Sequence, residues 1–262
     1  MVRAIYGDGV VTVVSLAFGL GICLLVCTGI VQLLRLGDRR ALRAIHRTVP
    51  TPVGSWAGGT GRVAMEGITD DGPAGPQTGP VSGERCSWYR VTLVREPRRG
   101  WSDDTYEPAL LDFASPGPPM VSDGSGRVAL DPRLFETPEQ HEPLVTTTTT
   151  LVHRRAAPVA LPAFVAADLL QDLRRSETLR LTEVRLPFAR EVYALALPAG
   201  EPVMLVPNPQ GVTVFTTENR EQVIARRRES IATAGWITRV FGLTGLIVAG
   251  ASYALLTFVL ST

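Results

Sequence analysis

The stretch VVTVVSLAFGLGICLLVCTGIVQLL, from Val10 to Leu34, decides the fold of this chain, and VFGLTGLIVAGASYALLTFVL, from Val240 to Leu260, matches it near the other end. Neither stretch contains a charged residue. At about 1.5 Å per residue, each is long enough as a helix to cross a hydrocarbon core of roughly 30 Å. Because an open backbone finds no hydrogen-bond partners in lipid, both stretches are predicted to be transmembrane helices.

A cleaved signal peptide and a lipoprotein anchor are two other interpretations of the first stretch. Its apolar region is longer than that of a signal peptide, and no A-x-A cleavage site follows it. Cys23 and Cys27 follow Ile22 and Val26, where a bacterial lipobox has a small residue. We therefore expect an uncleaved anchor in which both thiols behave as small apolar groups.

Arginines flank both stretches on the side of the middle segment. Those next to the first stretch are Arg35, Arg39, Arg40, Arg43 and Arg47, and those before the second are Arg220, Arg226, Arg227, Arg228 and Arg239. Only Arg3 precedes the first stretch. If the cell is bacterial, the positive-inside rule predicts two spans of the cell membrane, a cytoplasmic middle domain and both termini outside. The arginines are expected to bind anionic lipid headgroups of the bilayer.

These features divide the chain into a tail over 1–9, a transmembrane helix over 10–34, a middle domain with basic ends over 35–235, a second transmembrane helix over 236–260 and a tail over 261–262. The net charge is +1, and all 26 basic residues are arginine. No overall basic field points to a nucleic-acid partner. The 25 glycines and 20 prolines favour strands, turns and loops in the middle domain over a helical bundle.

Alternating side chains predict a mainly β middle domain of α+β or partly open barrel type. The clearest strand is ERCSWYRVTLVRE over 84–96. Further strands are expected over 61–69, 109–113, 119–122, 127–131, 146–150, 178–186, 191–197, 202–206 and 211–216. One amphipathic helix is expected over 162–175, and basic or charged helices over 36–47 and 218–230. Residues 70–80 are expected to be loop.

The residue types that carry enzyme chemistry are sparse. His46, His141 and His153 have no metal-ligand spacing, and no G-x-S-x-G nucleophile elbow occurs. The pairs Asp70-Asp71 and Asp103-Asp104 are interpreted as solvated loop charges. Without lysine there is neither a phosphate-binding P-loop nor a Schiff base. We predict no catalytic residues, no metal and no cofactor, with Cys86 a packed strand cysteine rather than a redox or nucleophilic thiol.

Two strings carry a family resemblance: Pro80-Val-Ser-Gly-Glu-Arg-Cys-Ser-Trp-Tyr-Arg90, and Asp123-Gly-Ser-Gly-Arg-Val-Ala-Leu-Asp-Pro132. In this order between two membrane helices, they resemble the GIDE domain, also called BAM for "beside a membrane". That domain lies between the two membrane helices of mulan-type mitochondrial E3 ubiquitin ligases and occurs in many bacterial membrane proteins. The late strand departs from the family pattern, because Arg190-Glu-Val-Tyr-Ala-Leu-Ala196 lacks both glycines of G-x-x-V-Y-x-x-G.

The resemblance implies a membrane-held GIDE/BAM domain, and its family label would be that of a RING-type E3 ubiquitin transferase with a role in organelle organisation. A RING needs eight Cys or His ligands for two zinc ions. This sequence has three of each, and two of the cysteines lie in the first apolar stretch. The ligase-related alternative is therefore not supported by the residues.

The favoured interpretation is a non-enzymatic domain that binds a protein, a lipid headgroup or a small ligand at the cytoplasmic face. Aromatic and arginine side chains dominate binding hot spots, so the candidate binding residues are Trp88, Tyr89, Arg90, Trp101 and Asp123. Core packing is the competing interpretation of Trp88, and a hairpin turn that of Asp123. A third hypothesis is homo-oligomerisation through small residues of the second helix, namely Gly242, Gly245, Ala249, Gly250 and Ala254.

Overall fold

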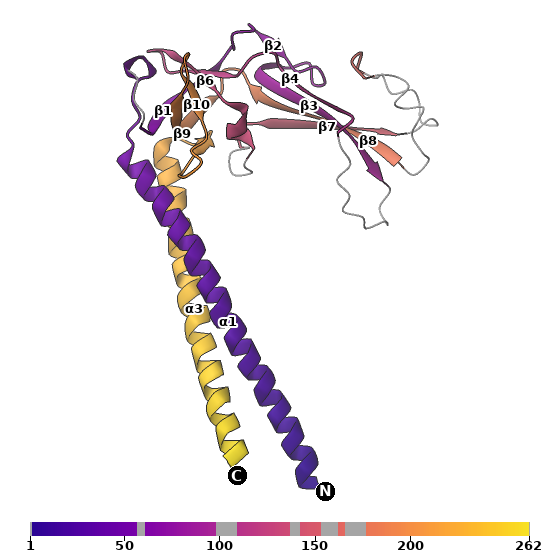
Figure 1. The fold of residues 1–262 in the computed structure, drawn as a ribbon, viewed down its shortest axis with the longest axis vertical. Helices are drawn as coiled ribbons and strands as arrows, with labels where there is room; N and C mark the ends of the chain where they lie inside the picture. Colours follow the sequence, from indigo (N-terminus) through magenta and orange to yellow (C-terminus); the bar gives the residue numbers. More distant parts are fainter. Residues whose placement is uncertain are drawn as a thin grey trace. The chain divides into compact units, whose positions relative to one another are not determined.

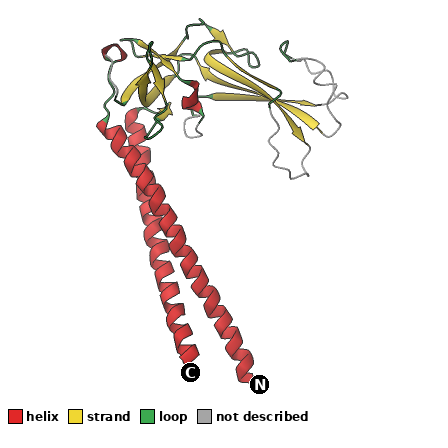
Figure 2. Cartoon of the chain, in the orientation of Figure 1, coloured by secondary structure: helices red, strands yellow, loops and turns green. Residues whose placement is uncertain are grey.

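A computed structural model of the chain describes residues 2–56, 61–97, 109–136, 142–152, 162–165 and 177–261. The chain forms two compact units. The first contains the two long helices, and the second, Thr48–Arg220, contains all the strands. Helices are red and strands yellow in Figure 2. The predicted combination of two long apolar helices with a mainly β region is confirmed.

The helical unit pairs α1, Val2–Arg47, with α3, Arg220–Ser261, and both chain ends lie at one end of this pair (Figure 1). Residues 36–47 do not form a separate helix, because α1 runs on through them without a break. The charged helix expected over 218–230, which was predicted to run on toward the second membrane segment, does so: it is the first part of α3. Each helix therefore joins an apolar half to an arginine-rich half, so the middle segment's basic ends belong to the helical unit rather than to the β unit.

Small residues allow the two helices to approach closely. A β-carbon on Gly21 would lie 2.6 Å from the backbone nitrogen of Ala249, and one on Gly245 would lie 3.0 Å from the carbonyl oxygen of Gly21. Such distances leave no space for a side chain at Gly21 and very little at Gly245. Gly245 and Ala249, two of the small residues proposed for oligomerisation, are thus buried against α1 of the same chain, whereas Gly250 is exposed.

Five strands of the β unit close a barrel. They are β1 (Val63–Asp70), β5 (Met120–Ser122), β6 (Arg127–Leu130), β9 (Glu191–Ala199) and β10 (Met204–Val206). Numbered one to five along the chain, they pair in the order 1-2-3-5-4-1, and only the pair of β6 with β10 is parallel. This is the strand order of an OB-fold barrel. The short β11, Val214–Thr216, pairs with β9 outside the closed ring.

The second sheet is built from two insertions into the barrel. The connection from β1 to β5 supplies β2 (Gln77–Thr78), β3 (Arg85–Pro97) and β4 (Leu111–Ala114), and the connection from β6 to β9 supplies β7 (Val145–Val152) and β8 (Glu177–Pro187). The central pair is β3 with β8; β2 and β4 pair with β3, and β7 pairs with β8. Two short 3₁₀ helices, η1 (Val53–Ser55) and η2 (Pro132–Phe135), complete the unit.

Two hydrophobic clusters correspond to the barrel and the second sheet, and β3 contributes to both. Trp88 packs with Phe135 and Phe215 in the barrel cluster, whereas Tyr89 packs with Phe113 against the second. The register of β3 against β8 shifts between Cys86 and Trp88. Because successive strand residues point to opposite faces, this one strand joins the two cores.

All ten predicted strands are present, within a few residues of their expected bounds. The expected loop over 70–80 differs: Asp70 ends β1 and residues 77–78 form β2. Of the amphipathic helix expected over 162–175, only residues 162–165 are described; they form a turn, and the rest of it, like Trp101, lies outside the described residues.

Candidate functional site

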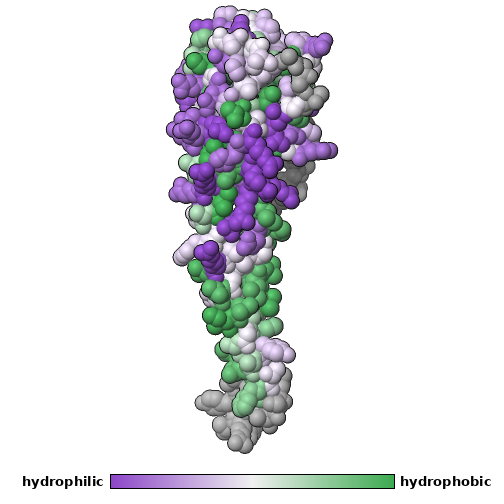
Figure 3. All heavy atoms as spheres, turned by 90° about the vertical axis from the view of Figure 1, so that its left-hand side faces the viewer, coloured by the Kyte–Doolittle hydropathy of each residue, from purple (hydrophilic) through white to green (hydrophobic). Residues whose placement is uncertain are grey.

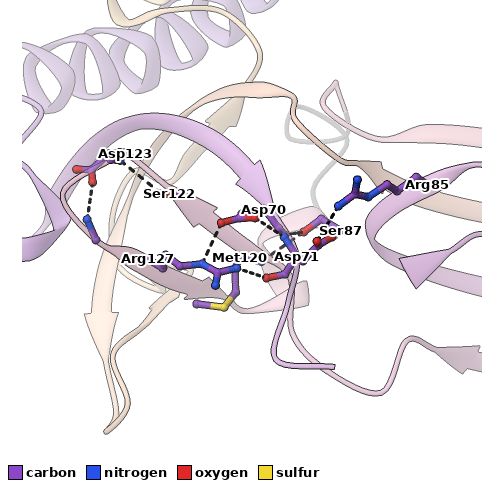
Figure 4. Close-up of polar contacts among 10 residues, drawn as sticks. Asp70, Asp71, Arg85, Ser87, Met120, Ser122, Asp123 and Arg127 are labelled. Carbon is purple, nitrogen blue, oxygen red and sulfur yellow. Dashed lines mark hydrogen bonds and ion pairs between the residues drawn. The ribbon is translucent and has the colours of Figure 1, made fainter. Parts of the chain in front are cut away.

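The barrel and the second sheet meet at a polar junction at the end of β1. The hydroxyl of Thr69 donates to the carbonyl of Pro187 and accepts from the amide of Arg190, at 2.6 and 2.8 Å. The hydroxyl of Ser87 donates to the carbonyl of Asp70 at 2.5 Å (Figure 4). Thr69 and Ser87 are both buried, so each hydroxyl satisfies backbone groups that water does not reach. The junction therefore fixes β1 to β3 and to the β8–β9 turn.

Two arginines, Arg85 and Arg127, form ion pairs with the aspartates of this junction. The Nε atom of Arg127 lies 2.9 Å from the Asp70 carboxylate, and its guanidinium also donates to the carbonyl of Asp71. Arg85 forms an ion pair with Asp71 at 2.7 Å and lies over the ring of Phe188. Figure 4 shows both arginines pointing toward the aspartates from different strands. The Asp70-Asp71 pair, interpreted from sequence as solvated loop charge, is thus part of a structured ion-pair network.

An apolar cleft of about 470 Å³ opens beside Arg127 on the outer face of the barrel. Strands β5, β6 and β10 form its floor, with Met120, Ala129 and Met204 among the lining residues. Loop residues complete it: Val53, Gly54, Trp56, Pro73, Pro118, Pro202 and Val203. Its volume is within the range of small-molecule and side-chain binding pockets. Among the described residues that line it, Arg127 is the only ionisable one, so this lining offers apolar contact with one charge at the rim.

A second hollow of about 490 Å³ lies between β1 and the β5–β6 turn and is lined partly by Glu66, Asp70 and Asp123. These carboxylates already have donors within the chain. Glu66 accepts from the amide of Arg220, and Asp70 binds Arg127. Asp123 accepts from Val53, Ser125 and Gly126. The hollow therefore offers weaker grounds for a ligand site than the apolar cleft.

The Asp123 carboxylate organises the start of the β unit. One oxygen accepts from the amide of Val53 at 2.7 Å, and the other accepts from the amide and hydroxyl of Ser125 and the amide of Gly126. Desolvation opposes ionisation of Asp123, but these hydrogen bonds outweigh it and lower the pKa of the carboxyl. Its contacts hold η1 against the β5–β6 hairpin, which places Val53 and Gly54 on the cleft wall.

The structure separates the other predicted binding residues. Trp88 is buried in the barrel core, and Tyr89 is half-buried at the second cluster. Arg90 is exposed and forms a bidentate ion pair with Asp112 of β4, at 2.8 and 2.7 Å. This pairing lowers the pKa of Asp112. These side chains do not converge on one surface, and the core interpretation of Trp88 accounts for its contacts.

Cys86 lies beside a buried charge cluster on the second sheet. Glu183 is fully buried, and one of its carboxylate oxygens accepts from the amides of Val81 and Ser82 at 2.6 and 3.2 Å. Arg185, also buried, lies 3.6 Å from its other oxygen. Burial, followed by the charge of Glu183, raises the pKa of the Cys86 thiol to about 11. A thiol with this pKa is almost wholly protonated at neutral pH, which suits a packed cysteine rather than a nucleophile.

The Pro80–Arg90 string has a structural explanation in this cluster. The loop after Gly79 folds over Glu183, whose carboxylate caps its amides. A β-carbon at Gly79 would lie 2.6 Å from a carboxylate oxygen of Glu183, so only glycine allows this approach. Among the residues described, no three His, Cys, Asp or Glu side chains form a group that could hold a metal ion.

Apolar side chains remain exposed along much of the helical unit (Figure 3). Of the 18 consecutive residues that are most apolar in each helix, only 11% are buried in α1 and 17% in α3. Both helices are long and apolar enough to cross a membrane. On α3, Trp236 and Tyr253 are both exposed and stand about 26 Å apart along the helix axis.

The predicted membrane-flanking arginines form two groups in the helical unit. Arg227 forms an ion pair with Asp38 at 2.7 Å, and Arg35 packs across Gly235. The rest of the set is exposed: Arg39, Arg40, Arg43, Arg226 and Arg228. The exposed members add positive charge to the polar half of the pair, while Arg35 and Arg227 also help to join the two helices.

Sequence reasoning missed the cleft and the buried carboxylate. The cleft is made by residues from five separate segments, most of them prolines, methionines and valines without a recognisable pattern. Glu183 occupies a position in Thr178–Leu186 that alternation assigns to the same face as Leu179 and Leu181. The available signal was the presence of charged residues, Glu183 and Arg185, at positions that alternation assigns to the inward face. The chain matches no protein-family model, no curated protein and no solved structure.

Proposed function

We propose that this chain is a membrane-anchored, non-enzymatic binding or scaffolding protein of the GIDE/BAM type. In this proposal α1 and α3 cross the bacterial cell membrane, and the β unit faces the cytoplasm. The outer-face cleft of the barrel takes apolar side chains from an extended segment of a partner protein. The observation that carries the proposal is the exposure of apolar side chains along both long helices.

The pattern of exposure favours lipid over water as the surroundings of the helices. A core helix of a soluble protein would be mostly buried, but the apolar windows of α1 and α3 are not. A cleaved signal sequence would account only for the helix near the N-terminus, and α3 has the same character at the other end. Contiguous exposed apolar surface of this extent is costly in water and favourable in lipid.

The arginine distribution supports the cytoplasmic orientation. Exposed arginines lie on the half of each helix that leads to the β unit, and the opposite ends are nearly uncharged. Positive flanks remain on the cytoplasmic side, where anionic lipids also attract them. Trp236, which is exposed, stands at the arginine-flanked start of the second span, where tryptophan side chains concentrate at a membrane interface.

The binding role rests on the position and lining of the cleft. By analogy of fold, the relevant surface is the one on which OB-fold barrels bind ligands, the face of their second and third strands with the neighbouring loops. Here those strands are β5 and β6, and Met120, Val128 and Ala129 line the cleft. The near absence of charge disfavours nucleic acid, whose phosphates require several basic contacts. Val203 is exposed at the rim, where a partner can reach it.

Anchoring and orientation can be tested together on the full chain. Native cysteines are replaced by alanine, and one cysteine is introduced at the exposed Glu191. We expect the protein to stay in the membrane fraction after alkaline carbonate washing. We also expect a membrane-impermeant maleimide to label position 191 of intact spheroplasts only after permeabilisation. Extraction by carbonate would contradict the anchoring, and labelling of intact cells would contradict the orientation.

The cleft can be tested with a photocrosslinking amino acid at Val203. Irradiation of living cells should yield one or a few discrete adducts, whose crosslinked peptide is extended and apolar by mass spectrometry. The substitution Met204→Glu, in the same cleft, should reduce these adducts at least tenfold because it places a charge among apolar groups. The same photoreactive residue at Glu191 is the matched control. Equal adduct patterns from positions 203 and 191 would overturn the cleft as the binding site.

A further inference from the structure

Strand β7 forms one border of the second sheet. All eight of its residues pair antiparallel with β8, from Val145 opposite Arg185 to Val152 opposite Thr178. Within the described part of the chain, no strand pairs with its other edge. That edge therefore presents a row of backbone donors and acceptors to whatever lies beside it.

The other described sheet borders in this unit are short, charged or closed, which protects them from pairing with a further strand, whereas β7 has none of these features. The opposite border of the same sheet consists of β2, with two residues, and β4, with four residues and the charged Asp112. The barrel strands close on one another, and β11 has only three residues, all buried. By contrast, β7 reads VTTTTTLV, with no charge and no proline over eight residues. Monomeric proteins rarely leave an edge of this length and composition unguarded.

The inner face of the sheet is also incomplete at β7. Thr147 and Thr149 lie opposite Glu183 and Leu181, two fully buried residues, yet both threonines remain partly exposed. Val145, on the same face, is 39% exposed. One further strand on this edge would cover these side chains and extend the hydrophobic cluster of the second sheet.

We propose that β7 pairs antiparallel with β7 of a second copy of this chain, about a twofold axis through Thr148. A strand without charge can lie beside its own copy without opposing like charges, which makes the edge self-complementary. A centre at Thr148 places each residue of 145–151 opposite another residue of that range. It also keeps inner-facing residues opposite inner-facing ones, since a one-residue shift would exchange the two faces.

This register sets the apolar positions that flank the threonines opposite each other, 145 against 151, and the threonine run opposite itself. Thr148, which is exposed, then faces Thr148 of the partner. Directly opposite residues have β-carbons about 4.5–5.5 Å apart, and diagonal neighbours about 7–8 Å apart. Only directly opposite positions are therefore close enough for a disulfide after a small adjustment.

The test uses the full chain in membranes, with Cys23, Cys27 and Cys86 replaced by alanine. Single variants T146C, T148C and T150C and the double variant T146C/T150C are oxidised with copper phenanthroline and separated on non-reducing gels. We expect a reducible homodimer from T148C and from T146C/T150C, and at least tenfold less from T146C or T150C alone. All three threonines are exposed on the same face of one strand. The single variants T146C and T150C are therefore matched controls for crosslinks that form through random encounter.

Equal crosslinking at 146 and 148 would overturn the proposal, because it would indicate random encounter. So would the absence of a homodimer from both T148C and T146C/T150C, including the case in which T148C is instead joined to a different protein. As a second measurement, T148K should lower the dimer fraction at least tenfold in detergent by light scattering, because it places like charges opposite each other. T182K, on the same face of the inner strand β8, should leave the dimer fraction unchanged. A dimer that survives T148K would also overturn the proposal.

Discussion

Gly21 of α1 faces Ala249 of α3 so closely that a β-carbon at position 21 would lie 2.6 Å from the Ala249 backbone nitrogen. The substitution Gly21→Leu should therefore force the helices apart. We expect a loss of about 1–3 kcal/mol, the usual cost of overpacking, seen as a lower midpoint of thermal unfolding in detergent. Gly19→Leu is the matched control, because a β-carbon on Gly19 would have no neighbouring atom within 4 Å. Equal effects of the two substitutions would contradict this helix contact.

The buried pair of Glu183 and Arg185 gives a second prediction. Glu183→Ala leaves the Val81 and Ser82 amides without their acceptor and removes the buried carboxylate next to Arg185, whose other ion pair is with Glu84. Breaking a buried pair on one side costs about 3–5 kcal/mol. Glu183→Gln, which keeps an acceptor oxygen, should lose less. The double variant E183A/R185A should be less unstable than the sum of the singles, and strict additivity in thermal unfolding would show that the two groups do not interact.

These residues also show where sequence reasoning ended. Uncharged length predicted the two helices, since a long apolar stretch has few alternatives. Alternation predicted β8, but the donors to Glu183 come from Val81 and Ser82, about a hundred residues away. Barrel closure was equally hidden, because it depends on β1 pairing with β9. Long-range partners of this kind leave no local pattern.

Asp131 provides a pH-dependent prediction. Its side chain is mostly buried, and hydrogen bonds from the Arg133 guanidinium, then from the Arg133 amide, lower the pKa of the carboxyl despite desolvation. A carboxyl with a lowered folded-state pKa stabilises the fold above its unfolded value of about 3.9. This contribution is lost as pH falls below about 4 toward the folded-state pKa. Asp131→Asn should lower the midpoint of thermal unfolding at pH 7. Between pH 5 and pH 3, this midpoint should fall less in the variant than in the unsubstituted protein. An identical pH profile for the two proteins would contradict the assignment.

Tyr193 has a buried hydroxyl with no hydrogen-bond partner in the described structure. Burial raises the pKa of this phenol to about 12. Removing an unsatisfied buried polar group removes its desolvation penalty, about 1–3 kcal/mol at most. Tyr193→Phe should therefore leave stability unchanged or raise it, whereas Tyr193→Ala should lower it by several kcal/mol through loss of core packing. A clear loss in Tyr193→Phe, measured by thermal unfolding, would show that the hydroxyl has a bonding role.

Neighbouring positions of β3 separate core from surface. Trp88→Ala removes a ring that packs on Phe135 and should cost about 3–5 kcal/mol. Arg90→Ala removes an exposed ion pair with Asp112 and should cost about 1 kcal/mol or less. Trp88→Phe should recover part of the loss while leaving photoadducts from position 203 unchanged. Loss of those adducts in a stable Trp88→Phe protein would favour a direct binding role for the indole.

The two insertions that build the second sheet also set the order in which the chain can fold. Val63 of β1 pairs with Ala196 of β9, so roughly 130 further residues must be synthesised before β1 can pair with β9. Contacts so distant in sequence form slowly, and unpaired strands are prone to aggregate meanwhile. During synthesis, α1 emerges long before β9 and β10, and α3 emerges directly after them. The barrel therefore closes only once β9 and β10 have been made, on a chain whose first apolar helix has long since left the ribosome.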